Sequence, residues 1–372
     1  MKSIYFILLF TLLSCTSNVE RSQYPIIDPT TFEEKELLLS DYVDDINFIS
    51  FDTNFIFKTF GDHYIDEQNI ILKTSEGIAR LTSDGKFLNK IGSIGQGPNE
   101  YTEQFYRMAI NPIEKKVYVY MMEKFRISTF LFDGTYIGTQ ELPHRIFSFP
   151  DSFIYNDGKF YFLFSLSISD LDSPQYEWAI LDTCSNTPFL RISPHKVWGR
   201  VHSPLFSSNY NNQLLYWNLY NDSIYHLKKG SYEVKYLWGK GDWRFTYEDG
   251  EQRFSPLRKD CVRPYSMCET DHYIYITFLR TEDKFFCIYD KTQNKGWGAS
   301  KITDDIYHMD IKFTWENYYK INGREYFSKR IFSDKLKETL YKGGTEEGRK
   351  LADKIDEEAG MMLMLVRLKN KK

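Results

Sequence analysis

Ile91-Gly-Ser-Ile-Gly-Gln-Gly-Pro-Asn-Glu-Tyr101 is the stretch around which this sequence is organised. Three glycines and a proline within seven residues require a backbone path that most residues adopt poorly. The stretch follows two apparent strands joined by a turn at Ser83-Asp-Gly-Lys86, and another round of strand, turn and strand begins soon after it. We therefore interpret it as the corner where one structural repeat passes to the next.

The order of strand, turn and strand recurs with a period of roughly 40–50 residues, which is typical of propellers and solenoids. Asp84-Gly85 and Asp133-Gly134 occupy the same position in the first two repeats, and Asp-Gly is a preferred hairpin connection. Six repeats, each holding four short strands, predict an all-β, six-bladed β-propeller. The predicted repeats open at His63, Phe105, Ser152, Leu214, His272 and Asp310.

The C-terminal segment departs from this pattern. Thr345 is a candidate N-cap for a short helix that ends at Gly360, because apolar residues recur between them at four-residue spacing. The apolar run Met361–Leu368 then predicts a strand that is buried on both faces. A circular fold needs its ends joined, so we expect this strand and the N-terminal strand Ile46–Phe51 to share the last blade and leave no free edge.

Composition agrees with an all-β chain and narrows the possible partners. Aromatic residues make up 17% of the 372 residues, and they favour pleated, half-buried surfaces. The net charge is −4, whereas proteins that bind nucleic acids usually present a basic face. We therefore expect no nucleic-acid partner.

The first residues have the pattern of an export signal rather than of the fold. A basic start precedes the apolar run Ile4–Leu13, which is too short to span a bilayer, and Leu12-Leu-Ser-Cys15 follows the lipobox pattern. We predict a signal peptide at residues 1–14, lipid attachment at Cys15, a polar tether at residues 15–36 and the propeller at residues 37–372. The alternative is an ordinary signal peptide with an unrelated cysteine.

Four further cysteines follow Cys15, namely Cys184, Cys261, Cys268 and Cys287. Outside the cytoplasm an even number permits disulfides, and Cys261 with Cys268 is the more probable pair because the two are close in sequence. Buried free thiols are an equally open alternative. No two of these cysteines have the Cys-x-x-Cys spacing of zinc sites, and the seven histidines are scattered, so we expect no metal and no cofactor.

Motifs spread over nearly the whole chain match those of one family. They are Leu12-Leu-Ser-Cys15, Leu39-Ser-Asp-Tyr-Val-Asp-Asp-Ile46, Ser83-Asp-Gly-Lys-Phe-Leu88, Gly95-Gln-Gly-Pro-Asn-Glu-Tyr101, Asn221-Asp-Ser-Ile-Tyr225 and Met362-Leu-Met-Leu-Val366. With these motifs the chain resembles the six-bladed β-propeller lipoproteins of Bacteroides and related gut bacteria, which are similar to NHL-repeat and TolB-like propellers. One residue departs from the family pattern: a glycine stands at position 360, where the resemblance leads us to expect an asparagine.

The resemblance implies a fold and a location, and it implies no particular activity. The location is the outer membrane, to which the protein would be anchored by lipid. The residues after Cys15 lack the acidic cluster that is associated with surface export in these bacteria. Both the periplasmic face and the cell surface therefore remain open.

The glycine-rich stretch is also a candidate ligand loop, through Gln96, Gly97 and Glu100. The alternative is structural, with Gly95, Gly97 and Pro98 shaping the turn, Tyr101 packed in the core and Glu100 bonded to backbone amides. It is not a phosphate loop, because no Lys-Ser/Thr pair and no helix follow it.

Other patterns for chemistry are weak. Asp66 and Glu67 are neighbouring carboxylates, and glycoside hydrolysis requires a pair of carboxylates as acid and base. Successive residues on a strand point to opposite faces, however, so these two would not act on one substrate. No Gly-x-Ser-x-Gly nucleophile elbow is present. We predict no catalytic residue.

All seven tryptophans lie after residue 177, and two of them, Trp198 and Trp243, fall in predicted loops beside Arg200 and Arg244. Such pairs can stack on a sugar or aromatic ring while the guanidinium reaches polar groups. The alternative for both is packing between blades. We expect a binding module for a glycan, a peptide or an envelope protein. The rival hypotheses are a carbohydrate-active hydrolase or lyase with its site at the central channel, and a structural partner with a flat apolar patch.

Overall fold

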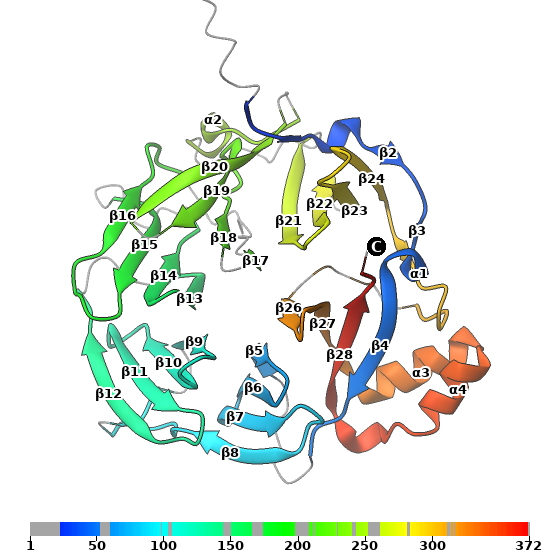
Figure 1. Cartoon of the computed structure of the whole chain (residues 1–372), viewed down its shortest axis with the longest axis horizontal. Coiled ribbons are helices and arrows are strands. Elements are labelled where there is room, and N and C mark those ends of the chain that lie inside the picture. The colour runs from blue at the N-terminus through cyan, green and yellow to red at the C-terminus, as the bar shows by residue number, and fades with distance from the viewer. Residues whose placement is uncertain are drawn as a thin grey trace, which may run out of the picture.

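The computed structural model describes most of the chain. The described residues are 23–52, 60–97, 99–102, 106–143, 150–165, 174–197, 208–210, 213–228, 230–239, 243–251, 261–280, 283–310, 313, 315 and 317–370. Six antiparallel four-stranded blades are arranged in a ring (Figure 1), so the predicted six-bladed β-propeller is confirmed.

The blades follow one another along the chain, and within each blade the strands run in order from the innermost to the outermost. Blade 1 is β5 (Phe60–Ile65), β6 (Asn69–Thr74), β7 (Gly77–Thr82) and β8 (Phe87–Ile91), and blade 2 is β9 (Tyr106–Asn111), β10 (Lys116–Met121), β11 (Arg126–Leu131) and β12 (Tyr136–Glu141). Blade 3 is β13 (Ser152–Asn156), β14 (Lys159–Leu163), β15 (Tyr176–Asp182) and β16 (Phe189–Ile192). Blade 4 is β17 (Ser208–Tyr210), β18 (Gln213–Tyr216), β19 (Ser223–Lys228) and β20 (Ser231–Trp238). Blade 5 is β21 (Val262–Glu269), β22 (Tyr273–Arg280), β23 (Asp283–Asp290) and β24 (Lys295–Ala299), and blade 6 is β26 (Tyr318–Ile321), β27 (Arg324–Phe332), β28 (Met361–Leu368) and β4 (Val43–Ile49).

The two Asp-Gly turns form as the sequence predicts. Gly85 and Gly134 have φ values of +92° and +93°, which are strained for residues with a side chain. A Cβ on Gly85 would also lie 2.1 Å from the carbonyl oxygen of Ser50. Glycine is therefore required at this turn both by the backbone conformation and by the close approach of Ser50, which directly follows β4 of blade 6.

The two ends of the chain close the ring inside blade 6, as predicted. β28 lies between β27 and β4, with Leu363 opposite Arg330 on one side and Ile49 on the other. Leu363 and Met364 are fully buried and point to opposite faces, toward blade 1 and toward the core shared with blade 5 respectively. A propeller closed in this way has no unpaired edge at the junction of its termini.

The prediction for the region between β27 and β28 is wrong in part. Thr345 caps α4 (Glu346–Ala352) by accepting a hydrogen bond from the Gly348 amide, but this helix ends eight residues before Gly360, and a short 3-10 turn (Glu357–Ala359) follows. A further helix, α3 (Ser333–Gly343), was not predicted. It packs its buried residues Leu336 and Leu340 on blade 6, so its stability depends on tertiary contacts.

Blade 6 also begins later than predicted. Asp310 and Phe313 lie outside any strand, and β26 is the innermost strand instead. Blade 6 still has four strands, because β28 and β4 fill its third and fourth places.

Residues 26–38, which fall largely within the predicted tether, run along the outside of the ring as a strap (Figure 1). β1 (Ile26–Ile27) pairs in parallel with the outer strand of blade 4, and β2 (Glu33–Glu34) with that of blade 5. Beyond the 3-10 turn Pro29–Thr31, β3 (Leu37–Leu38) pairs with β25 (Ile302–Thr303), and α1 (Leu39–Tyr42) leads into β4. Ile27 and Leu37 are fully buried, so this stretch belongs to the fold, and the tether prediction now concerns only the residues before it.

The predicted disulfide between Cys261 and Cys268 does not form, and all four cysteines after Cys15 are free thiols. Strand β21 separates the two residues, and a strand advances by about 3.3 Å per residue. Their Cα atoms are therefore about 20 Å apart, far beyond the ~7 Å limit for a disulfide. Cys268 instead donates a hydrogen bond to the carbonyl of Trp315.

The strand ends that the connections between blades join lie on one face of the ring. A blade of four antiparallel strands is entered and left at the same end, so the described ends of the strand pairs β8–β9, β12–β13, β16–β17, β20–β21 and β24–β26 lie on one face, which we call the crossover face. The α3–α4 pair also lies there, because it links the second and third strands of blade 6. Among the described residues no helix is long and apolar enough to cross a membrane.

Candidate functional site

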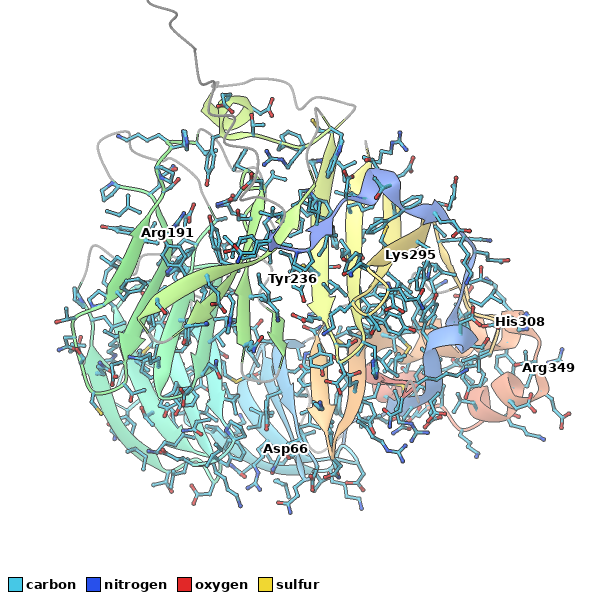
Figure 2. The ribbon with its side chains drawn as sticks, turned by 45° about the horizontal axis from the view of Figure 1, so that its top comes forward. Asp66, Arg191, Tyr236, Lys295, His308 and Arg349 are labelled. Atoms are coloured by element: carbon cyan, nitrogen blue, oxygen red, sulfur yellow. The ribbon has the colours of Figure 1, made fainter. Side chains whose placement is uncertain are left out.

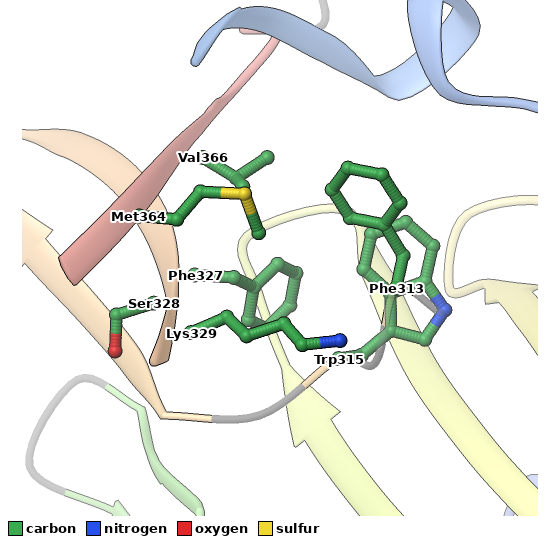
Figure 3. Close-up of a pocket in the computed structure, with 7 residues that line it drawn as sticks. All are labelled: Phe313, Trp315, Phe327, Ser328, Lys329, Met364 and Val366. Atoms are coloured by element: carbon green, nitrogen blue, oxygen red, sulfur yellow. The ribbon is translucent and has the colours of Figure 1, made fainter. Parts of the chain in front are cut away.

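One enclosed pocket of the protein is small. It lies in blade 6, where Phe327, Met364 and Val366 face Phe313 and Trp315 (Figure 3). It has room for about one water molecule. A second pocket, of about 260 Å³ and more open to solvent, is lined by Asp44, Arg324, Leu368, Lys369 and Asn370.

The predicted residues Trp243 and Arg244 lie on the crossover face, in the β20–β21 connection. Trp243 is half-buried, its ring packs edge-on against Trp238 at 5.5 Å between centroids, and its carbonyl accepts a hydrogen bond from the Val262 amide. Arg244 forms a parallel bridge with the same residue, Val262. The other predicted pair, Trp198 and Arg200, lies outside the described residues.

The residues flanking both predicted pairs meet in one small core. Val197 precedes Trp198 in the sequence, Phe245 follows Arg244, and the two are buried in the same cluster with Leu219 and Tyr220. The connections that leave blades 3 and 4 are thus packed together at this point. The structure brings these two connections to one place, although they are more than forty residues apart in the sequence.

A stack of three rings is centred on Tyr247, four residues after Trp243; His195 and Tyr247 are half-buried, and Tyr220 is buried. The ring of Tyr247, the first residue of α2 (Tyr247–Glu251), lies 4.2 Å from that of His195 with an interplanar angle of 20°. Its centroid is 5.9 Å from that of Tyr220, at an angle of 26°. We call His195, Tyr220, Trp243 and Tyr247 the aromatic rim.

A buried carboxylate holds the rim in place. Glu177 on β15 is fully buried, and it accepts hydrogen bonds from Arg191 Nε at 2.6 Å, Asn218 Nδ2 at 3.1 Å and the Tyr247 hydroxyl at 3.0 Å. Burial raises the pKa of Glu177, and the charge of Arg191 opposes that shift. Because all three donors come from different connections or strands, the carboxylate ties blade 3 to blade 4 directly under Tyr247.

Arg191 lies on β16 (Figure 2). Aromatic rings surround its guanidinium, whose carbon lies 4.6 Å from the ring centroid of Tyr232, 5.0 Å from that of Tyr225 and 5.1 Å from that of Trp178. A guanidinium over an aromatic face is stabilised by the ring quadrupole. The ion pair of Arg191 with Glu177 is therefore held in a fixed position between blades 3 and 4.

Sequence reasoning singled out Trp243 and Arg244 but did not single out Tyr247, His195 or Glu177. One signal was present: Glu177 directly precedes the apolar run Trp178–Leu181, which has the pattern of a strand. A charged residue at a buried strand position usually has a partner. Nothing in the sequence, however, points to Arg191 as that partner.

The glycine-rich loop has the geometry of a structural turn. The Glu100 carboxylate accepts a hydrogen bond from the Gly97 amide at 2.7 Å, and a Cβ on Gly95 would lie 2.0 Å from the same carboxylate oxygen. Gln96 is exposed, and Pro98 lies outside the described residues. The loop thus wraps around the Glu100 side chain, and glycine at position 95 is what leaves room for it.

Tyr101 ends the loop and is buried. Its hydroxyl accepts a hydrogen bond from the Ile78 amide at 2.8 Å and donates one to the Ile91 carbonyl at 3.1 Å. We expect Tyr101→Phe to lower the free energy of unfolding by ~1–3 kcal/mol, because it leaves two buried backbone groups without a hydrogen-bond partner. Urea denaturation measures the change. The matched control is Tyr136→Phe, whose hydroxyl pairs with Thr139 near the surface, and an equal loss in both variants would contradict the expectation.

The remaining candidates from the sequence have structural roles. Asp66 accepts hydrogen bonds from the amides of Gln68 and Asn69 at the β5–β6 turn, on the face opposite the crossover face (Figure 2). Within the described ranges no group of three or more His, Cys, Asp or Glu side chains is arranged to hold a metal ion.

Comparisons with known proteins agree with this fold. The model of a family described as a domain of unknown function, DUF4934, matches residues 24–367. A solved structure of a Bacteroides fragilis protein described as exported is similar over 93% of this chain and 100% of its own, with 14% identity and a TM-score of 0.70. A DUF4221 member from Bacteroides vulgatus is similar over 89% of this chain and 98% of its own, with 11% identity and a TM-score of 0.49. No curated protein matches the chain.

Proposed function

The chain belongs to the DUF4934 family, and from this premise we propose that it is an exported binding module, held on the outer membrane by lipid on Cys15. The proposed ligand is a glycan, a peptide or a partner protein of the envelope. Two observations support export: the lipobox-like Leu12-Leu-Ser-Cys15, and the description of the similar Bacteroides fragilis protein as exported.

The observation that carries the binding proposal is the aromatic rim. Its rings come from three separate connections on one face, and they are half-buried or, in Tyr220, buried with a hydroxyl that has no partner among the described residues. Aromatic side chains with a polar atom suit surfaces that bind sugars and peptides, since one part is apolar and the other forms hydrogen bonds.

The rim is also fixed before any ligand arrives. The Tyr247 hydroxyl is bonded to Glu177, and Glu177 is bonded to Arg191 and Asn218. A surface that is already ordered loses less conformational entropy when it binds, so such a brace increases affinity. The Glu177 network therefore suits a binding role better than an acid–base role, because each of its donors is already engaged.

The test is a binding screen of the mature chain, purified in neutral detergent, against an array of gut glycans and peptidoglycan fragments. For a ligand found there, we expect Trp243→Ala to weaken binding about tenfold or more, since the stacking of one ring contributes ~1–3 kcal/mol. Trp297→Ala is the matched control, because Trp297 is also half-buried but lies on the outer strand of blade 5. Binding that survives Trp243→Ala, or that falls equally in both variants, would remove the rim as the contact surface.

A further inference from the structure

The innermost strand of blade 1 contains a β-bulge close to the crossover face. Phe60 pairs with Thr74 and His63 with Leu72, so Gly61 and Asp62 together stand opposite the single residue Lys73. Gly61 and Asp62 are both exposed. Bulges of this kind often redirect side chains next to functional sites, and this one includes Asp62 on β5, the innermost strand of blade 1 (Figure 1).

Three cations surround the bulge, and they come from three consecutive blades. Lys73 lies on β6 of blade 1, Arg107 on β9 of blade 2 and Arg330 on β27 of blade 6. All three are at the crossover-face ends of their strands. Lys73 and Arg107 are half-buried, and Arg330 is exposed.

None of these cations has an acidic partner within 4 Å among the described residues. Each donates instead to a backbone carbonyl: Lys73 to that of Tyr106, Arg330 to that of Phe60, and Arg107, at 3.5 Å, to that of Pro150. Several other partly buried cations of this protein are paired with carboxylates, as Arg191 is with Glu177, and Lys235 and Lys291 are with Glu269. Arg80 and Arg126 instead donate to an amide oxygen and a backbone carbonyl. The three cations of the bulge thus differ from Arg191, Lys235 and Lys291 in having no carboxylate partner.

Electrostatic effects show that the charges form one group. Burial lowers the pKa of Lys73, with Asp62 opposing the shift and Arg107 adding to it. Burial also lowers the pKa of His63 to about 4, and the charge of Arg330 adds to that effect. His63 is therefore neutral at pH 7, and three cations face one carboxylate. The group has a net charge of +2 (three minus one) in a chain whose total is −4.

We propose that Lys73, Arg107 and Arg330 form a binding site for an anionic group of an oligosaccharide, either a carboxylate or a sulfate. The site lies at the inner ends of blades 6, 1 and 2, whereas the aromatic rim lies on blades 3 and 4. It is therefore a separate site, and the proposal for it does not depend on the proposal for the aromatic rim.

The side chains suit this ligand chemistry. The Lys73 ammonium lies 4.3 Å from the ring centroid of Tyr106, and its hydrogen bond to the Tyr106 carbonyl uses one of its three N–H donors. Arg330 and Arg107 can offer forked N–H pairs, which match the oxygen geometry of carboxylates and sulfates. The exposed Asp62 would repel an anion that is placed badly and would accept a hydrogen bond from a neighbouring sugar hydroxyl. Asp62 thereby favours an acidic sugar over a bare anion.

The test uses the mature chain in neutral detergent and isothermal titration calorimetry at constant ionic strength. The probes are a trigalacturonate and a heparin-derived tetrasaccharide, with neutral maltotetraose as the reference. We expect one or both anionic probes to bind at least tenfold more tightly than maltotetraose. Tighter binding of the trigalacturonate would identify a carboxylate site, and tighter binding of the sulfated probe a sulfate site. Equal binding of all three probes, or no anionic binding at millimolar concentration, would overturn the proposal.

Variants then assign the residues. We expect Lys73→Gln to weaken anion binding about tenfold and Arg330→Gln about threefold, while Asp62→Asn strengthens it because a repelling charge is removed. Lys320→Gln is the matched control: Lys320 lies on the innermost strand of blade 6, but Asp271 already pairs with it. Because Arg330 and Asp62 are exposed, their variants keep the fold even if Lys73→Gln does not. Unchanged affinity in Arg330→Gln together with weaker binding in Asp62→Asn would contradict the assignment.

Discussion

Leu363→Asp is expected to leave the protein largely unfolded. Leu363 is fully buried in β28, which lies between β27 and β4, and it packs among Ile49, Ile70 and Leu81 at the junction with blade 1. An unpaired carboxylate at a dry position costs several kcal/mol, and the lost leucine packing adds ~2–5 kcal/mol. Together these losses are comparable to the whole stability of a typical domain, about 5–15 kcal/mol.

The measurement is the far-UV circular dichroism spectrum and the urea denaturation curve of the purified variant. Leu88→Asp provides a matched control, because Leu88 is a leucine on the outer strand of blade 1 with 44% of its surface exposed. We expect the control to change stability by no more than ~0.5 kcal/mol. A Leu363→Asp protein with a native spectrum and denaturation midpoint would show that the ring does not depend on its terminal strands.

Glu177→Ala is expected to lower the free energy of unfolding by ~3–5 kcal/mol, because it leaves the Arg191 guanidinium in an aromatic enclosure without its counter-charge. It also removes the acceptor for Asn218 and for the Tyr247 hydroxyl. Since Tyr247 then loses its anchor, ligand binding at the aromatic rim should weaken as well. Urea denaturation measures the first effect, and titration of the ligand found in the array measures the second.

The matched control is Glu233→Ala. Glu233 also pairs with basic side chains, His226 and Lys228, but half of its side chain is exposed. Exposed pairs contribute little, and we expect a change within ~0.5 kcal/mol. Glu177→Gln should lie between wild type and Glu177→Ala, because it keeps the shape and some hydrogen bonds but not the charge. If Glu177→Ala were no worse than Glu233→Ala, the Glu177 network would not act as a brace between blades 3 and 4.

The repeat pattern made the fold predictable, because local chemistry specifies each blade. Asp84-Gly85 and Asp133-Gly134 predicted turns that the structure contains, and the apolar run Met361–Leu368 predicted the strand that closes the ring. α3 and the strap over blades 4 and 5 were not predicted, and the reason is the same for both. Their local sequence signals are weak, and they are stabilised by packing against blades formed by other parts of the chain.

The candidate site was predictable only in part. Trp243 and Arg244 were recognisable as an aromatic and a cation in a loop, a pattern that local sequence carries. Tyr247 lies in the same connection as these two residues, but His195 and Glu177 come from blade 3 and the connection that leaves it, so their contacts with Tyr247 depend on how blades 3 and 4 pack. The three cations near the bulge come from blades 6, 1 and 2, and their sequence positions show no common pattern.

The sequence by itself determined the architecture of this protein, since strand periodicity, turn residues and an apolar final strand act through contacts between neighbours in the chain or between consecutive repeats. Only the tertiary structure decided which side chains share a surface and which charges lack a partner. Closing the ring places residues from distant repeats side by side, and hydrogen bonds and electrostatic effects fall off within a few ångströms. The aromatic rim and the group of Lys73, Arg107 and Arg330 at the bulge therefore form only once the blades are packed.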